Sequence, residues 1–195
     1  MKSNVFILPA LLLAVSLLQG CATAVVGGAA TGAAVAHDRR TVGTFVDDEI
    51  IEVKATQKIF SDKELFDNTH INVTSYNNIV LLSGEAPTEA LRSKAYNTVS
   101  PIPKVRKVHN EIVIAAPSSL LTRSSDTWIT AKVKTNLFQV KDMPDFDPTR
   151  IKVISENGTV FLMGIVRRNE ADTVINASRT VSGVQRVVKL FEYLD

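Results

Sequence analysis

The chain has 195 residues, of which 45% are hydrophobic and 22% are charged, and this composition excludes a mostly disordered protein. Its length is enough for one medium-sized domain or two small ones. A net charge of +2 is too close to balance for a protein whose main partner is nucleic acid, and a single cysteine excludes a disulfide framework within the chain.

The N-terminus has the features of a secretory signal peptide. Met1 and Lys2 give a positively charged start, and residues 5–18 form an uncharged apolar run of 14 residues. A helix needs about 20 apolar residues to cross a bilayer, so this run is too short for a membrane span. It therefore predicts a signal peptide over residues 1–20.

The signal peptide ends in a sequence that resembles the bacterial lipobox, Leu18-Gln19-Gly20-Cys21. In a lipobox the cysteine thiol accepts diacylglycerol, and the chain's one cysteine lies at this position. We therefore expect Cys21 to carry a covalent lipid, with no other cofactor. An ordinary secretory signal followed by an incidental cysteine is the alternative. Ala22 replaces the aspartate typical of inner-membrane retention, which predicts an anchor in the outer membrane at its periplasmic face.

Residues 21–43 read as the lipidated cysteine followed by a flexible linker rich in alanine and glycine. Gly27, Gly28 and Gly32 oppose a stable helix, so a tether is the expected structure. A helix-packing motif is the alternative reading of the same glycines. Arg39 and Arg40, near the end of the linker, are expected either to meet lipid headgroups or to be solvated.

The remaining chain contains two copies of one unit. Four residues of the first copy recur 78 positions later in the second: Asp48, Ile51, Lys54 and Phe60 as Asp126, Ile129, Lys132 and Phe138. Matches this regular predict a duplicated module. We expect one domain over residues 44–116, a linker over 117–124 and a second domain over 125–195. Because this linker is short, the two domains are expected to touch or to sit in a restricted orientation.

Each copy has the same pattern of elements. Helices are predicted over 47–60 and 126–138, hairpins beginning at 71 and 151, second helices over 87–98 and 169–180, and closing strands over 107–114 and 186–194. Asn157-Gly158 is typical of a tight hairpin turn, whereas Asn77-Asn78 leaves the turn type of the first hairpin open. The order αββαβ predicts an α+β fold, in which two helices cover one face of a small sheet.

These patterns resemble the BON domain, here in tandem. The matching segments also resemble the dual-BON outer-membrane lipoproteins: DRRTVGTFVDD from Asp38, INVT from Ile71, SDTWITAKV from Ser125, and VSGV-RV from Val181. The resemblance implies a protein anchored in the outer membrane and facing the periplasm. It also implies that the second domain binds anionic phospholipid and that the protein supports envelope integrity.

An enzyme is not expected, because the chain lacks the motifs that catalysis uses. His37, His70 and His109 lie in no zinc-ligand spacing, and no nucleophile elbow or phosphate-binding loop is present. No metal site is predicted. The acidic cluster of Asp142, Asp145 and Asp147 is expected to be a solvated loop, with a cation site as the alternative.

The helix predicted over 126–138 is the candidate lipid-binding element. Residues 123–195 carry 11 basic and 9 acidic side chains, against 8 and 10 in residues 44–116, so the second domain suits an anionic surface better. Ile129, Val133 and Leu137 form one apolar stripe of this helix, and Ala131 and Phe138 lie nearly opposite. A sheet can bury only one of these two stripes. Its candidate lipid-binding residues are Trp128, Ile129, Lys132, Val133, Leu137 and Phe138.

The orientation of this helix and the environment of Trp128 are not fixed by the sequence. The helical wheel does not decide which stripe faces solvent, and Trp128 could be a core residue equivalent to Ile50 in the first copy. The expected partner is an anionic, phosphatidylglycerol-like membrane. The alternative function is an adaptor that binds envelope-assembly or division proteins.

Overall fold

The computed structural model describes residues 38–140, 143 and 145–194, which belong to one compact unit beginning at Asp38. The predicted signal peptide, Cys21 and the linker up to residue 37 lie outside the described residues. Among those described, no helix has the length and apolar character needed to cross a membrane.

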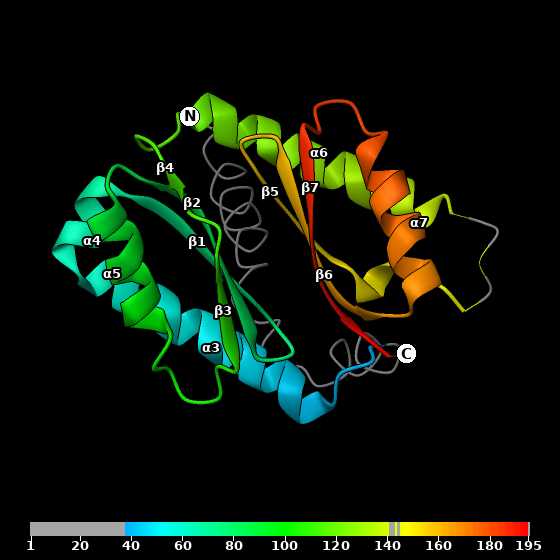
Figure 1. Cartoon of the computed structure of the whole chain (residues 1–195), viewed down its shortest axis with the longest axis horizontal. Coiled ribbons are helices and arrows are strands. Elements are labelled where there is room, and N and C mark those ends of the chain that lie inside the picture. Colours follow the sequence, from blue (N-terminus) through cyan, green and yellow to red (C-terminus); the bar gives the residue numbers. More distant parts are fainter. Residues whose placement is uncertain (1–37, 141–142, 144, 195) are drawn as a thin grey trace, which may run out of the picture. The chain divides into compact units, whose positions relative to one another are not determined.

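The first repeat folds as an α+β sandwich (Figure 1). Its elements are α3 (Val42–Ser61), α4 (Lys63–Asn68), β1 (His70–Tyr76), β2 (Ile79–Ala86), α5 (Glu89–Val99), β3 (Lys107–Asn110) and β4 (Val113–Ile114). Strand β2 is central: it pairs antiparallel with β1 and parallel with β3, and its end pairs with β4.

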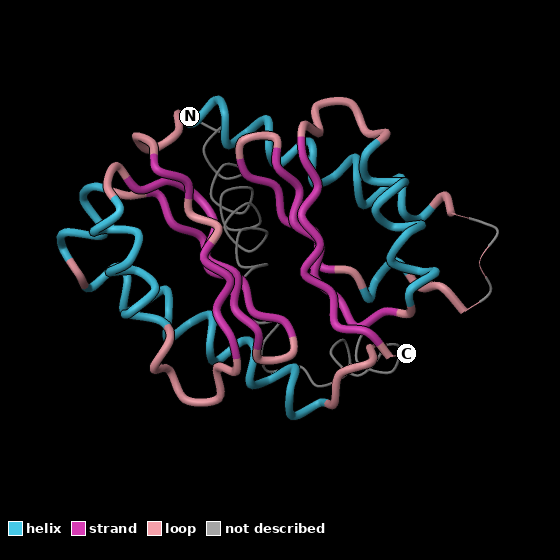
Figure 2. Tube along the Cα trace, viewed as in Figure 1, coloured by secondary structure: helices cyan, strands magenta, loops and turns pink. Residues whose placement is uncertain are grey.

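The second repeat has the same topology. Its elements are α6 (Leu120–Phe138), the short 3-10 helix η1 (Pro148–Arg150), β5 (Lys152–Glu156), β6 (Thr159–Val166), α7 (Arg168–Arg179) and β7 (Arg186–Tyr193). Here β6 is central, antiparallel to β5 and parallel to β7. In each repeat the helices cover one face of the sheet (Figure 2). The predicted αββαβ order and α+β class are confirmed.

Two helices begin earlier than predicted because a hydroxyl residue caps each N-terminus. The Thr41 side chain accepts a hydrogen bond from the Thr44 N–H, so α3 begins at Val42 and takes up the end of the predicted linker. The Ser119 side chain accepts one from the Thr122 N–H, so α6 begins inside the linker predicted over 117–124.

The two hairpin turns have the same backbone conformation. Asn77 and Asn78 have φ values of 52° and 63°, and Asn157 and Gly158 have values of 47° and 70°. Two successive residues with positive φ are the requirement of a type I′ turn, and asparagine tolerates this conformation. The turn type that the sequence left open is therefore the same in both repeats.

A buried aspartate in the first helix of each repeat holds its hairpin turn. Asp48 accepts hydrogen bonds from the backbone N–H groups of Asn77 and Asn78, both at 2.8 Å. Asp126 accepts them from Asn157 at 2.9 Å and from Gly158 at 3.0 Å. The recurrence of aspartate 78 positions apart thus marks a structural contact between helix and hairpin.

Each repeat has its own apolar core between helices and sheet. A third cluster joins the opposite faces of the two sheets, with buried residues Tyr76, Ile79, Leu81, Phe161 and Met163. All eight residues of β2 are buried, because one face of this strand packs on helices and the other on the second repeat. The repeats therefore touch, as the short connection between them predicts.

Candidate functional site

Helix α6 presents an exposed face with a large aromatic side chain near the middle of the helix. Trp128 is 70% exposed and Phe138 is 64% exposed, and Lys132 and Lys134 are also exposed. At 100° per residue, Trp128 and Phe138 lie about 80° apart on the wheel and about 15 Å apart along the axis. Trp128 is therefore a surface residue, and the alternative that places it in the core is wrong.

The apolar stripe formed by every fourth residue of the predicted site faces inward. Ile129, Val133 and Leu137 are 5%, 0% and 1% exposed and belong to the core of the second repeat. Their inclusion among the lipid-binding residues is therefore corrected, because these side chains pack against the sheet and leave no surface to contact. Of the six candidates, Trp128, Lys132 and Phe138 remain on the surface.

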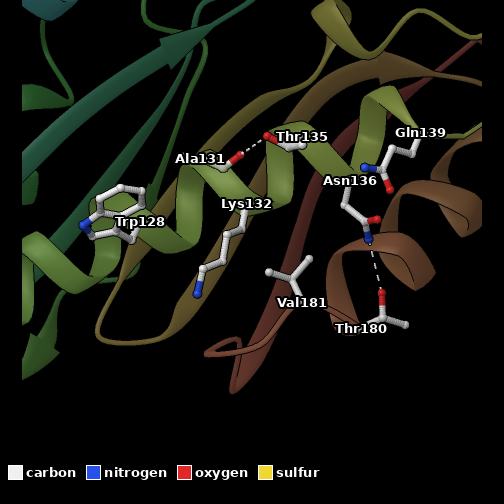
Figure 3. Close-up of a pocket in the computed structure, with 8 residues that line it drawn as sticks. All are labelled: Trp128, Ala131, Lys132, Thr135, Asn136, Gln139, Thr180 and Val181. Carbon is white, nitrogen blue, oxygen red and sulfur yellow. Dashed lines mark hydrogen bonds between the residues drawn. The ribbon is translucent and has the colours of Figure 1, made fainter.

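A shallow pocket of about 390 Å³ adjoins the exposed tryptophan. It is lined by Trp128, Ala131, Lys132, Thr135, Asn136, Gln139, Thr180 and Val181. Figure 3 shows that the first six come from α6 and its end, and the last two from the segment after α7. Asn136 joins these segments, since its side-chain amide donates to the Ala177 carbonyl at 2.7 Å and to Thr180 Oγ1 at 3.3 Å.

The exposed charges of α6 all have one sign. Its one acidic residue, Asp126, is 5% exposed and holds the hairpin turn, whereas Lys132 and Lys134 face solvent. Helix α3 differs because Glu49 is exposed along with its lysines. An apolar ring beside ammonium groups, with no exposed carboxylate on the same helix, suits an anionic interface.

The first repeat carries an exposed apolar surface that was not predicted from its sequence. Six of its side chains on α3 and α4 are 44% to 65% exposed: Val42, Val46, Ile50, Val53, Phe60 and Phe66. Phe60 and Phe66 pack edge to face with centroids 5.5 Å apart. The duplication could have indicated this surface, because Ile50 and Phe60 are equivalent to Trp128 and Phe138, two candidates for the surface of the second repeat.

The two arginines at the end of the predicted linker are held by carboxylates. Arg39 contacts Glu170 through two hydrogen bonds of 2.6 and 2.7 Å. Arg40 contacts Asp38 and Asp48, and its guanidinium lies 4.0 Å from the centroid of the Tyr76 ring. Both expectations for this pair, headgroup contact and solvation, are corrected: the side chains are partly buried in ion pairs.

The acidic loop of the second repeat contains a local cap. Asp147 Oδ1 accepts hydrogen bonds from the Thr149 N–H at 2.9 Å and from the Thr149 hydroxyl at 2.6 Å, at the start of η1. Asp142 lies outside the described residues. The described part of this loop thus uses Asp147 to begin a helical turn.

Comparison with known proteins supports the duplication. The BON domain model matches residues 47–116 and again residues 125–195. The chain is 39% identical to the outer membrane lipoprotein DolP of Haemophilus influenzae over 181 residues, which cover 91% of each chain. It is 36% identical to a 21 kDa hemolysin of Actinobacillus pleuropneumoniae, covering 80% of this chain and 79% of that protein.

A more distant relative is the osmotically-inducible protein Y of Escherichia coli, with 27% identity over 80% of this chain and 77% of that protein. Two BON matches together cover most of the sequence, and the DolP similarity extends over nearly all of it. This chain therefore belongs to the BON-domain family and is a tandem-BON, DolP-like outer-membrane lipoprotein.

Proposed function

We propose that this protein is a non-enzymatic lipoprotein, anchored by lipid on Cys21 at the periplasmic face of the outer membrane, that binds anionic phospholipid and supports envelope integrity. The observation that carries the binding proposal is the exposed Trp128 beside Lys132, on a helix whose one acid is buried. Trp128, Phe138 and the two lysines are the proposed contacts, revised from the six expected from sequence.

The magnitudes favour a weak contact that depends on the anchor. An inserted tryptophan and a neighbouring apolar side chain contribute roughly 2 to 4 kcal/mol, at about 25 cal/mol per Å² of buried apolar area. Each lysine near an anionic surface adds about 1 kcal/mol. Ordering and desolvation reduce this sum, so the free energy of binding is near −4 kcal/mol, which is millimolar affinity. A tether supplies a local concentration on that scale.

The test compares equivalent positions in the two repeats. Trp128→Glu places a charge where the ring inserts, and Ile50→Glu places one at the matching position of the first repeat. At about 10 mM phosphatidylglycerol, which exceeds a millimolar dissociation constant, we expect the Trp128 variant of fragment 38–195 to lose flotation with vesicles, and the Ile50 variant to keep it. Neither should unfold, because both side chains are exposed. Equal binding by the folded Trp128 variant and the parent would contradict the proposal.

The exposed apolar surface of α3 and α4 favours a second candidate function. Contiguous exposed apolar side chains often mark protein interaction sites, so the first repeat could dock an envelope-assembly or division protein. Crosslinking in cells separates the two functions. A stoichiometric protein partner that is lost with Ile50→Glu, kept with Trp128→Glu and independent of lipid composition favours the adaptor.

A further inference from the structure

Three potential metal ligands from both repeats meet at one end of the sheets. His70 begins β1, Glu85 lies near the end of β2, and Glu156 ends β5. One ligand atom of each lies within 4.8 Å of the other two. His70 and Glu85 are direct cross-strand partners, and His70 Nε2 is 3.5 Å from Glu156 Oε1. The group therefore combines an imidazole with two carboxylates.

Both carboxylates are removed from water. Glu85 is 0% exposed and Glu156 is 7% exposed. Their neutral partners are amides: Asn157 donates to Glu85, and the Asn72 side chain donates to Glu156 at 2.8 Å. Burying two carboxylates this close together is unfavourable unless a proton or a cation neutralises them.

The charged groups around the cluster leave it negative. Arg123 and Asp126 line the adjoining cavity. The Arg123 guanidinium donates to the Ser118 carbonyl at 2.9 Å, and Asp126 adds a further carboxylate. Arg123 and Asp126 both act electrostatically on Glu156, so one arginine and one further carboxylate accompany the two glutamates.

A buried hydroxyl without a partner lies on the same face of β2 as Glu85. Ser83 is 0% exposed, and its Oγ has no hydrogen-bond partner among the residues that the structure describes. Ser83 is two residues from Glu85 on the same face of β2 and is the cross-strand partner of Asn72. The face of β2 that carries Glu85 therefore holds a second buried polar group, and this one is unsatisfied.

The cluster is reachable from solvent. A cavity of about 340 Å³ is lined by His70, Asn72 and Glu156, among other residues of β5 and α6. That volume is far larger than the share of about 30 Å³ that one water occupies in the liquid. An ion and its remaining water can therefore reach His70 and Glu156, whereas Glu85 is fully buried and does not line this cavity.

We propose that His70, Glu85 and Glu156 bind one divalent transition-metal ion that joins the first repeat to the second. Imidazole nitrogen with carboxylate oxygen is a donor set that Zn²⁺ accepts, with the fourth position open to water. Zinc bonds of about 2.1 Å place tetrahedral ligand atoms about 3.4 Å apart, so ligand atoms that lie within 4.8 Å of one another move together by at most about 1.4 Å on binding. This inference is independent of the proposed lipid contact.

The experiment titrates ZnCl₂ into the full-length protein in detergent, after EDTA treatment and dialysis, at pH 7.5. Calorimetry is expected to show one site per chain. His70→Gln and Glu156→Gln should each weaken it at least tenfold. His109→Gln is the matched control, a partly buried histidine on β3 of the same sheet, and should bind zinc as the parent does. Circular dichroism checks the fold of each variant.

A second measurement uses the unmodified sequence, so it does not depend on whether the variants fold. Added Co²⁺ should broaden the ring signals of His70 strongly and those of His109 much less. The proposal is overturned if the parent binds no zinc under these conditions. It is equally overturned if folded His70 and Glu156 variants bind as the parent does, or if cobalt leaves His70 unaffected.

Discussion

The guanidinium of Arg39 pairs with the carboxylate of Glu170, 131 residues later in the chain. The same arginine donates to the Ile165 carbonyl at 2.8 Å, and Glu170 also accepts from the Arg167 N–H at 2.7 Å. Burial alone would raise the pKa of Glu170, but the hydrogen bonds from Arg39 and Arg167 hold it below its ordinary value. The segment before α3 is thereby fixed to the start of α7 in the second repeat.

Arg39→Ala is expected to lower the free energy of unfolding of fragment 38–195 by about 2 kcal/mol, because it leaves the buried Glu170 carboxylate without its cation. Lys104→Ala is the control. Its ion pair with Asp47 has the same 2.6 Å length, but the lysine side chain is 63% exposed. Removing such a pair changes stability by about 0 to 1 kcal/mol. Urea denaturation measures both, and equal losses would contradict a structural role for Arg39.

Two glycine substitutions should change stability in opposite directions. Gly84 has a φ of +116°, and a Cβ built there would lie 2.0 Å from the His70 carbonyl oxygen. Gly84→Ala is therefore expected to destabilise the fragment by more than about 2 kcal/mol. Gly43 lies in the first turn of α3, where the nearest atom to such a Cβ is 3.8 Å away. Gly43→Ala should raise the melting temperature by reducing the freedom of the unfolded chain.

Stability should depend on pH through Glu156 when metal is removed with EDTA. Burial is the main cause that raises the pKa of Glu156 to about 7 from its ordinary value of 4.5, and the nearby Glu85 and Asp126 add to it. Between these values the folded state binds more protons than the unfolded state, so the free energy of unfolding falls as pH rises through this window.

Glu156→Gln replaces the titrating carboxyl group by an amide that does not titrate, so this variant serves as the reference for the pH series. Burial lowers the pKa of His70, which acts in the opposite direction below pH 6.5, but this effect is present in both proteins. The parent should therefore lose stability relative to the variant from pH 5 to pH 7.5. A constant difference across this range would show that Glu156 titrates normally in the fold.

The lysines of α6 should determine the salt dependence of vesicle binding. Replacing Lys132 and Lys134 by glutamine is expected to weaken binding to phosphatidylglycerol vesicles by about 30-fold at low salt, since each contributes about 1 kcal/mol. Salt should weaken the parent only partly, because inserted apolar area is not screened. Lys54→Gln, at the position equivalent to Lys132, is the control and should leave binding unchanged.

Much of the fold could be predicted because its signals are local. The alternation of each hairpin and the periodicity of each helix lie within short stretches of sequence, and the repeat then supports each element twice. The second buried face of β2 could not be predicted, because its apolar run is equally typical of a strand with one covered face. Ser83 and Glu85 are polar residues on that hidden face, so nothing in the sequence indicated that they are buried.

The candidate site was predicted in part for a similar reason. A helical wheel places Trp128 and Ile129 about 100° apart but does not say which of them faces the sheet. That choice depends on the whole packing of the core, which selects Ile129, Val133 and Leu137. The His70, Glu85 and Glu156 cluster is harder still to find, because its members meet only when the two repeats pack together.

In the first helix of each repeat, the residue that holds the hairpin turn and the residue that faces solvent are different, closely spaced positions. Asp48 and Asp126 make the same backbone contacts, while two residues further on one copy has Ile50 and the other Trp128, both exposed. Once the module was duplicated, the outward position could change from aliphatic to aromatic without altering the inward one. The exposed positions of the two repeats could thus acquire different chemistry on the same fold, because the buried aspartates maintain the contact with the hairpin turn.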